Sequence, residues 1–314
     1  MPLYLTEDDV AGLVEPAGAV AVIEDCFRRM AAGAVELMPR RRFPVEGGYF
    51  AVMAAADREL GFAGLKSYTI VEGRLAFVVC LFSLADGSLS ALIEADRLGQ
   101  VRTGAASGVA ARHLARRGSA SVGLIGSGWQ AQSQLAAIRA AVPSIQRALV
   151  WSRSPAKVEA FCAQTGAEPA ESAQEVAECD VVVTVTTSKD PVLRGDWLRE
   201  GALVCAVGAN DPRARELDNA VLERASFVCC DSLEDSRLES GDLIEPVAAG
   251  VLDWLEVHEL HEVVAGETPG RQAPSDIVVF KSNGIAAWDV AIAAEAVGRA
   301  RERGVGRDLE EAAR

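Results

Sequence analysis

The chain has 314 residues, half of them hydrophobic and 24% charged, a composition typical of a globular protein with two domain cores. Its formal net charge of −14 disfavours binding to nucleic acid or anionic membranes, which would repel it. The longest nearly apolar stretch, residues 75–85, is far shorter than the roughly 20 residues of a membrane helix. Glu7, Asp8 and Asp9 stand where a signal peptide would be basic. We expect a soluble, cytoplasmic protein that acts on small molecules.

The first part of the chain, up to about residue 115, mixes helical and strand-like segments. Residues 20–32 have the pattern of a helix, and three alternating runs at 48–53, 64–70 and 75–83 predict strands. An Ala-rich helix is predicted over 96–116, and it ends at a plausible joint near residue 118. This pattern predicts an α+β domain over residues 1–117.

The second part alternates strands with helices. Strands are predicted at 121–126 and 147–152, helices at 129–141 and 155–164, and further apolar runs lie at 180–186, 202–208, 226–230 and 277–281. Such alternation predicts an α/β domain over 118–284, a Rossmann-type doubly wound parallel sheet with helices on both faces. The C-terminal segment, residues 285–314, begins with an Ala-rich helix, and we expect it to pack back on the first domain.

A glycine-rich motif marks the junction of the first strand and helix of this second domain. It consists of Gly126, Ser127, Gly128, Trp129, Gln130 and Ala131. The first glycine permits a tight turn, the second allows close approach of a pyrophosphate, and the alanine allows helix and strand to pack closely. Because strand, turn, helix and second strand follow at the right spacing, the motif predicts a dinucleotide site.

The end of the second strand of this domain indicates which dinucleotide is bound. NAD-binding sites present an acidic residue there to the ribose hydroxyls, whereas this chain has Ser152, Arg153 and Ser154. A guanidinium flanked by hydroxyls suits a 2′-phosphate, which a carboxylate would repel. The sequence therefore favours NADP(H) over NAD(H), the alternative being an ordinary surface arginine.

Six segments, in chain order, resemble the ornithine cyclodeaminase/mu-crystallin family. They are GLKSYT around Lys66, RTGAASGVAARHLAR from Arg102, LIGSGWQAQ, VWSRS, VGANDPRARELD from Val207 and VFKSNGIAAWD from Val279. The resemblance implies a homodimer formed through the first domain, which also carries the substrate residues, and an active site that faces the cofactor. It further implies hydride transfer at the α-carbon of a small amino or imino acid.

Carried over by position, the resemblance implies a set of site residues. Arg41 and Arg102 would hold the substrate carboxylate, as two guanidiniums can, and Lys66 would be the acid/base at the reacting nitrogen. Each assignment has an alternative. Arg41 belongs to a run of three arginines, which could form a solvated basic face, or the substrate arginine could be a neighbour in the run. Lys66 could be an ordinary surface lysine, and Arg102 could cap its helix or form a salt bridge. Further candidates for cofactor binding are Val207, Gly208, Lys281 and Ser282.

Two positions depart from the cyclodeaminase branch of the family. Asn210 occupies the catalytic position of an aspartate, with Asp211 one residue later, and Ala51 stands where a glutamate would bind the distal amine. An amide cannot act as a general base, and alanine cannot bind an ammonium. The leading hypothesis is therefore an NADPH-dependent reductase of small α-imino acids, or the reverse amino-acid dehydrogenase. The alternatives are a lyase that converts ornithine to proline with NAD recycled, and a non-catalytic cofactor-binding protein.

Cysteine and histidine patterns predict no metal site. The seven cysteines are odd in number, contain no CxxC pair and lie mostly in apolar runs, which predicts buried thiols in a reducing compartment. The segment HELHE, with His258 and His261, lacks the HExxH pattern of zinc enzymes, and we interpret it as a solvated helix face.

Overall fold

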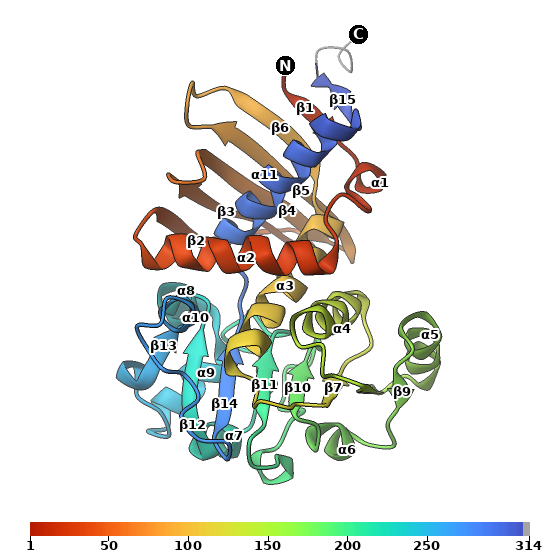
Figure 1. Ribbon diagram of the computed structural model, residues 1–314, viewed down its shortest axis with the longest axis vertical. Helices are drawn as coiled ribbons and strands as arrows, with labels where there is room; N and C mark the ends of the chain where they lie inside the picture. The colour runs from red at the N-terminus through yellow and green to blue at the C-terminus, as the bar shows by residue number, and fades with distance from the viewer. Residues whose placement is uncertain (310–314) are drawn as a thin grey trace. The chain divides into compact units, whose positions relative to one another are not determined.

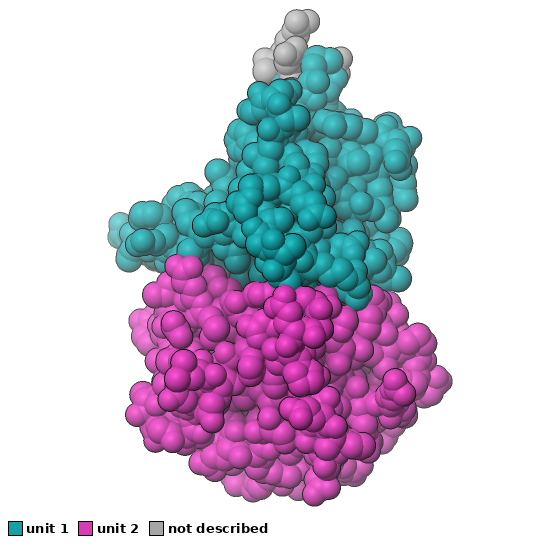
Figure 2. Space-filling model, turned by 60° about the vertical axis from the view of Figure 1, so that its left-hand side comes forward, with its two compact units in different colours: residues 1–102, 285–314 teal, residues 103–284 magenta. Residues whose placement is uncertain are grey.

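The computed structural model describes residues 1–309, which divide into two compact units (Figure 2). Unit 1 comprises Met1–Arg102 and the chain from Ile285 onward, and unit 2 comprises Thr103–Gly284. The division falls inside helix α3 (Asp96–Leu114), ahead of the boundary expected near residue 118. The second half of α3 packs within unit 2, where a Cβ on Gly104 would lie 2.3 Å from a backbone oxygen of α4 (Trp129–Ala141). The domain assignment 1–117 and 118–284 remains a prediction, and residues 310–314 of the expected C-terminal segment lie outside the described residues.

Unit 1 is built on a seven-stranded sheet with the order β15-β1-β6-β5-β4-β3-β2. Its strands are β1 (Leu3–Leu5), β2 (Val35–Val45), β3 (Gly48–Asp57), β4 (Phe62–Val71), β5 (Arg74–Ser83), β6 (Leu89–Glu94) and β15 (Arg307–Asp308). Besides the short α1 (Glu7–Val10), the long helices α2 (Pro16–Ala31) and α11 (Ala286–Arg303) lie on one face of this sheet (Figure 1). Alternate residues of β3 are buried beneath them, as the period of two in a strand requires.

Unit 2 is built on an eight-stranded, fully parallel sheet with the order β13-β12-β14-β11-β10-β7-β8-β9. The strands are β7 (Ser121–Ile125), β8 (Arg147–Trp151), β9 (Glu168–Pro169), β10 (Val181–Thr184), β11 (Leu203–Ala206), β12 (Ala225–Cys230), β13 (Val257–Glu259) and β14 (Ile277–Lys281). The helices are α4, α5 (Pro155–Thr165), α6 (Ala173–Ala177), η1 (Gly195–Trp197), α7 (Asn219–Arg224), α8 (Leu233–Glu239), α9 (Gly241–Ala248), η2 (Trp254–Glu256) and α10 (Leu260–Val264). Six neighbouring strands, in the spatial order β9-β8-β7-β10-β11-β14, follow the 3-2-1-4-5-6 order of a dinucleotide-binding fold. Strands β12 and β13 extend the sheet beyond β14.

The predicted fold class is confirmed: a Rossmann-type parallel sheet accompanies a second α+β unit. The strands and helices predicted between residues 121 and 164 are confirmed within one or two residues. Strands β2 and β6 were not predicted. The prolines and arginines of β2 obscure its alternation of polar and apolar residues, and β6 has only six residues. Among the helices of residues 1–309, none is long and apolar enough to cross a membrane.

Candidate functional site

A buried charged cluster in unit 1 joins three elements. Lys66 on β4, Arg102 on α3 and Asp289 on α11 are all at least nine-tenths buried. One carboxylate oxygen of Asp289, Oδ1, accepts hydrogen bonds from Lys66 Nζ at 3.1 Å and from Arg102 Nε at 3.2 Å. Both residues assigned from the resemblance therefore meet at a carboxylate that the sequence analysis did not identify.

The environment of Lys66 changes its acidity. Burial lowers the pKa of Lys66, Asp289 opposes this shift and the positive charges of Arg102 and Arg40 add to it, and the net result is a pKa of about 8. Gly99 on α3 makes room for the ammonium, since a Cβ at Gly99 would lie 2.8 Å from Lys66 Nζ. An amine with this pKa can give or take a proton near neutral pH.

The structure places Arg40, and not Arg41, beside this cluster. A register shift in the pairing of β2 with β3 leaves Pro39 and Arg40 opposite the buried Met53, and the Arg40 guanidinium lies 3.7 Å from its sulfur. Arg41 pairs with Val52 on the other face and is exposed. A β-bulge changes which face a side chain occupies, so Arg40 and not Arg41 points into unit 1, and the carboxylate contact expected of Arg41 remains a prediction.

Several buried polar atoms of the cluster have no hydrogen-bond partner. They are Nη1 of Arg102, Oδ2 of Asp289 and the indole Nε1 of Trp288. The Arg102 guanidinium lies 5.8 Å from the centre of the Trp288 ring. Buried polar groups are normally paired, and unpaired donors here suit a ligand with an anionic group.

The glycine-rich motif forms one wall of a cavity of about 310 Å³ in unit 2. Gly126 has φ +117°, and a Cβ there would lie 2.4 Å from the carbonyl oxygen of Val185, so a side chain cannot be accommodated. Gly128 is the N-cap of α4, has no side-chain cap, and has open space where a Cβ would be. A helix N-terminus next to a side-chain-free surface fits the pyrophosphate of a dinucleotide.

The rest of the motif is divided between packing and exposure. Ala131 is fully buried, as close packing of helix and strand requires, whereas the side chain of Trp129 is 41% exposed. Ser127 lines the cavity, and its hydroxyl lies 2.8 Å from that of Ser152. Gln130, in the first turn of α4, is half-buried and does not line the cavity.

The cavity also contains the basic group expected at the end of β8. Ser152, Arg153 and Ser154 line it together with Lys157, which the sequence analysis missed. Lys157 lies in the first turn of α5, four residues after Arg153, and this spacing could have identified it. Within residues 1–309 neither Arg153 nor Lys157 has an ion-pair partner, although the chain carries a net charge of −14. Cationic side chains between hydroxyls are groups that can pair with the oxygens of a phosphate.

Four other candidates lie at the carboxyl ends of β11 and β14. Val207 and Gly208 follow β11 directly and are half-buried. Lys281 is wholly buried, with Nζ 2.5 Å from the Ala209 carbonyl, and the Ser282 hydroxyl donates to Asp231 at 3.0 Å. The side chains of Lys281 and Ser282 are thus already bound within the protein, and their contact with a cofactor remains a prediction.

The two positions that depart from the cyclodeaminase pattern, Ala51 and Asn210, lie in different units. Ala51 is fully buried on β3, opposite Tyr68 of β4. Asn210 is half-buried in the segment after β11. The adjacent Asp211 forms a two-pronged ion pair with Arg213 at 2.9 and 3.0 Å.

The HELHE segment is more enclosed than the expected solvated helix face. His258 lies on β13, not on a helix, and its Nδ1 is 3.0 Å from Glu262. Glu259, His261 and Glu262 bring possible ligand atoms within 4.8 Å of one another. The carboxylates already accept hydrogen bonds, Glu259 from the Leu233 amide at 2.7 Å.

Comparison with known proteins gives matches along the whole chain. A model of the ornithine cyclodeaminase/mu-crystallin family matches residues 2–304. The alanine dehydrogenase of Archaeoglobus fulgidus is 34% identical over 97% of both chains. The structure of Thermococcus litoralis Δ1-pyrroline-2-carboxylate reductase in complex with NADH and L-proline has a TM-score of 0.92 and 32% identity, covering 98% of this chain and 100% of that one. An archaeal alanine dehydrogenase dimer with bound NAD has a TM-score of 0.91 and 32% identity over 98% of each chain.

Proposed function

Because the chain belongs to the ornithine cyclodeaminase/mu-crystallin family, as its sequence predicted, we propose that it is an NADPH-dependent oxidoreductase that reduces small α-imino acids, or oxidises the corresponding amino acids. The observation that carries this proposal is the buried cluster of Lys66, Arg102 and Asp289. It combines a binding group for a carboxylate with an amine of matched acidity, as reduction of an imino acid requires.

Each group of the cluster has a role in the proposed reaction. The bound cofactor supplies a hydride to the imine carbon. Arg102, whose buried Nη1 has no partner, binds the substrate carboxylate with help from Arg40. Lys66 donates a proton to the substrate nitrogen during reduction and accepts one in the reverse direction. Asp289 holds Lys66 and Arg102 in place. The carboxylate bound by Arg102 and the nitrogen protonated by Lys66 can therefore belong to the same substrate molecule.

The preference for NADP(H) rests on the cavity of unit 2. Arg153 and Lys157 provide two cations that the 2′-phosphate of NADPH can pair with, and no carboxylate lines the cavity. Two of the relatives with solved structures contain NADH or NAD, so this preference would distinguish the present chain from those two.

We also propose that the protein is a homodimer formed by unit 1. The sheet face opposite α2 and α11 carries exposed apolar side chains, including Met38, Phe50 and Phe82, and a groove of about 380 Å³. A continuous apolar face of this kind is typical of an interface. A second copy is the proposed occupant, because a relative of the same fold is a dimer.

The other two hypotheses have less support. Ala51 and Asn210 carry no acid, and Asp211 is bound to Arg213, which argues against binding of the distal amine of ornithine at these positions. The unpaired polar atoms around Arg102 argue against a protein that only binds cofactor.

The decisive assay follows oxidation of NADPH and NADH with a panel of cyclic and acyclic α-imino acids, and proline formation from ornithine with catalytic NAD. We expect net NADPH oxidation with an imino acid, and ornithine turnover at background. Losing a general base typically lowers a rate by roughly 10²–10⁴-fold. Robust ammonia release from ornithine, abolished by Asp211→Ala, would establish the lyase instead. Cofactor binding without turnover of any imine would establish the non-catalytic protein.

A further inference from the structure

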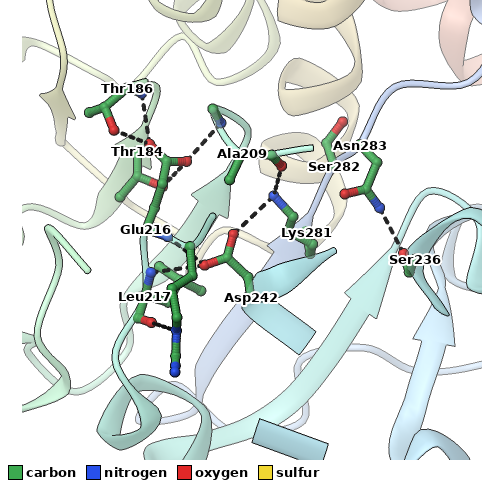
Figure 3. A network of polar contacts seen from close by, with 12 residues as sticks. Thr184, Thr186, Ala209, Glu216, Leu217, Ser236, Asp242, Lys281, Ser282 and Asn283 are labelled. Carbon is green, nitrogen blue, oxygen red and sulfur yellow. Dashed lines mark hydrogen bonds and ion pairs between the residues drawn. The ribbon is translucent and has the colours of Figure 1, made fainter. Parts of the chain in front are cut away.

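Glu216 is a fully buried acid in unit 2 whose carboxylate accepts four hydrogen bonds (Figure 3). Its Oε1 accepts from the amide and hydroxyl of Thr186, at 2.7 and 2.8 Å. Its Oε2 accepts from the Thr184 hydroxyl at 3.0 Å and from the Gly208 amide at 2.7 Å. One side chain therefore joins the end of β10 to the end of β11.

These two strand ends belong to the cofactor side of the sheet. Thr186 lines the dinucleotide cavity together with Thr187 and Ser188, and Gly208 leads into the segment that carries Asn210. In open parallel sheets, ligands bind at the carboxyl ends of the strands. Glu216 itself and Thr184 do not line the cavity, so they can act on it only through their partners.

Two further buried charged residues, Asp242 and Lys281, support the backbone around Glu216. Asp242 Oδ1 accepts from the amides of Glu216 and Leu217, at 2.7 and 2.9 Å. Lys281 Nζ lies 3.1 Å from Asp242 Oδ2 and donates to the Ala209 carbonyl at 2.5 Å. The Gly208–Ala209 backbone is thus held on its amide side by Glu216 and on its carbonyl side by Lys281.

The geometry requires a glycine at position 208 and favours a carboxylate at Glu216, since each of its oxygens accepts from a backbone amide, although burial raises the pKa of Glu216. A Cβ on Gly208 would lie 2.5 Å from Glu216 Oε1 and 2.4 Å from the Thr186 nitrogen. All four partners of the carboxylate donate hydrogen bonds, so the NH₂ of a glutamine would leave some of these donors unpaired.

We propose that Glu216 is a positioning residue of the dinucleotide site, which sets the Thr186 wall of the cavity and the Gly208 backbone in the geometry that binds cofactor. Asp242 and Lys281 keep Glu216 in that orientation. The inference rests on the proposed function, since it takes NAD(P)(H) as the ligand of the cavity.

The test measures the dissociation constants of NADH and NADPH for the full-length protein by cofactor fluorescence, well below its melting temperature. Glu216→Gln is expected to weaken both cofactors by about 10–100-fold, because buried donors lose their acceptor. The ratio of the two constants should stay unchanged, since Glu216 is not part of the basic group around Arg153. The matched control is Glu223→Gln, an exposed glutamate on α7, which should bind as the wild type does.

Thr184→Val gives a second variant that keeps side-chain shape and removes one donor to Glu216. It should weaken both cofactors by several-fold, and the double variant should bind no worse than Glu216→Gln alone, because Thr184 acts through that carboxylate. Wild-type affinity in folded Glu216→Gln, or in Thr184→Val should the first variant not fold, would overturn the inference. A wild-type protein that binds neither cofactor would overturn the proposed function and this inference together.

Discussion

The proposed preference for NADP(H) depends on two side chains, Arg153 and Lys157. Arg153→Ala is expected to weaken NADPH binding by about 1.5–3 kcal/mol and to leave NADH nearly unchanged, as for the loss of a charge-assisted hydrogen bond. Lys157→Ala should also weaken NADPH binding, but by less, since an ammonium binds phosphate as a point charge and does not form the two parallel hydrogen bonds of a guanidinium. Titration of each variant with both cofactors checks this, and equal losses for NADH and NADPH would contradict the assignment.

Proton transfer depends on Lys66 and its partner Asp289. The ammonium is the active form in reduction, so the reductive rate should fall as pH rises through about 8, the lowered pKa of Lys66. The Asp289 carboxylate favours the charged amine, and Asp289→Asn should therefore move this fall to lower pH. The measurement is the pH profile of kcat/KM for the imino acid in both proteins. If kcat/KM falls at the same pH in both proteins and only its magnitude differs, Asp289 has only a structural role.

At the scale of an element, α3 contributes to the site through Gly99. Gly99→Ala should displace the Lys66 ammonium and lower kcat by up to about 100-fold, because small misplacements of a reacting group are costly. Stability should not fall much, since alanine favours a helix by about 1 kcal/mol over glycine. Gly298→Ala on α11 is the matched control: no atom lies within 4 Å of its added Cβ, and it should be slightly more stable and fully active. Thermal melts and initial rates of both variants separate the two effects, and a fully active Gly99→Ala would contradict this role of the glycine.

At the scale of the whole molecule, the exposed apolar face of unit 1 should decide assembly. Phe82, 37% exposed on β5, belongs to this face, and Phe82→Glu is expected to convert a dimer to monomers of 33.1 kDa by placing two charges in an apolar interface. Leu255 in unit 2 is 88% exposed and lies outside the face, so Leu255→Glu should leave the dimer intact. Light scattering coupled to gel filtration distinguishes these results. A wild-type monomer, or a dimeric Phe82→Glu variant, would contradict the proposed interface.

The sequence by itself determined the features that depend on neighbours in the chain. Strand and helix periods, the glycine turn after β7 and the basic residues after β8 are local patterns, and they predicted the Rossmann-type unit and its cavity. The family resemblance is likewise carried by short ordered segments. The chain therefore predicted its fold class and the two residues, Lys66 and Arg102, that the structure brings together.

Only the tertiary structure decided which other side chains complete the site. Asp289 is 223 residues from Lys66 in sequence and 187 from Arg102, and no local pattern shows that a helix at the end of the chain returns to β4 and α3. Arg40 is buried and Arg41 exposed because the pairing of β2 with β3 contains a bulge, which the β2 sequence alone does not specify. Glu216 likewise reaches Thr186 and Gly208 only after the parallel sheet has placed β10 beside β11. Contacts between segments that are distant in the chain form when helices and strands pack together. The local sequence pattern shows only whether each segment favours a helix, a strand or a turn.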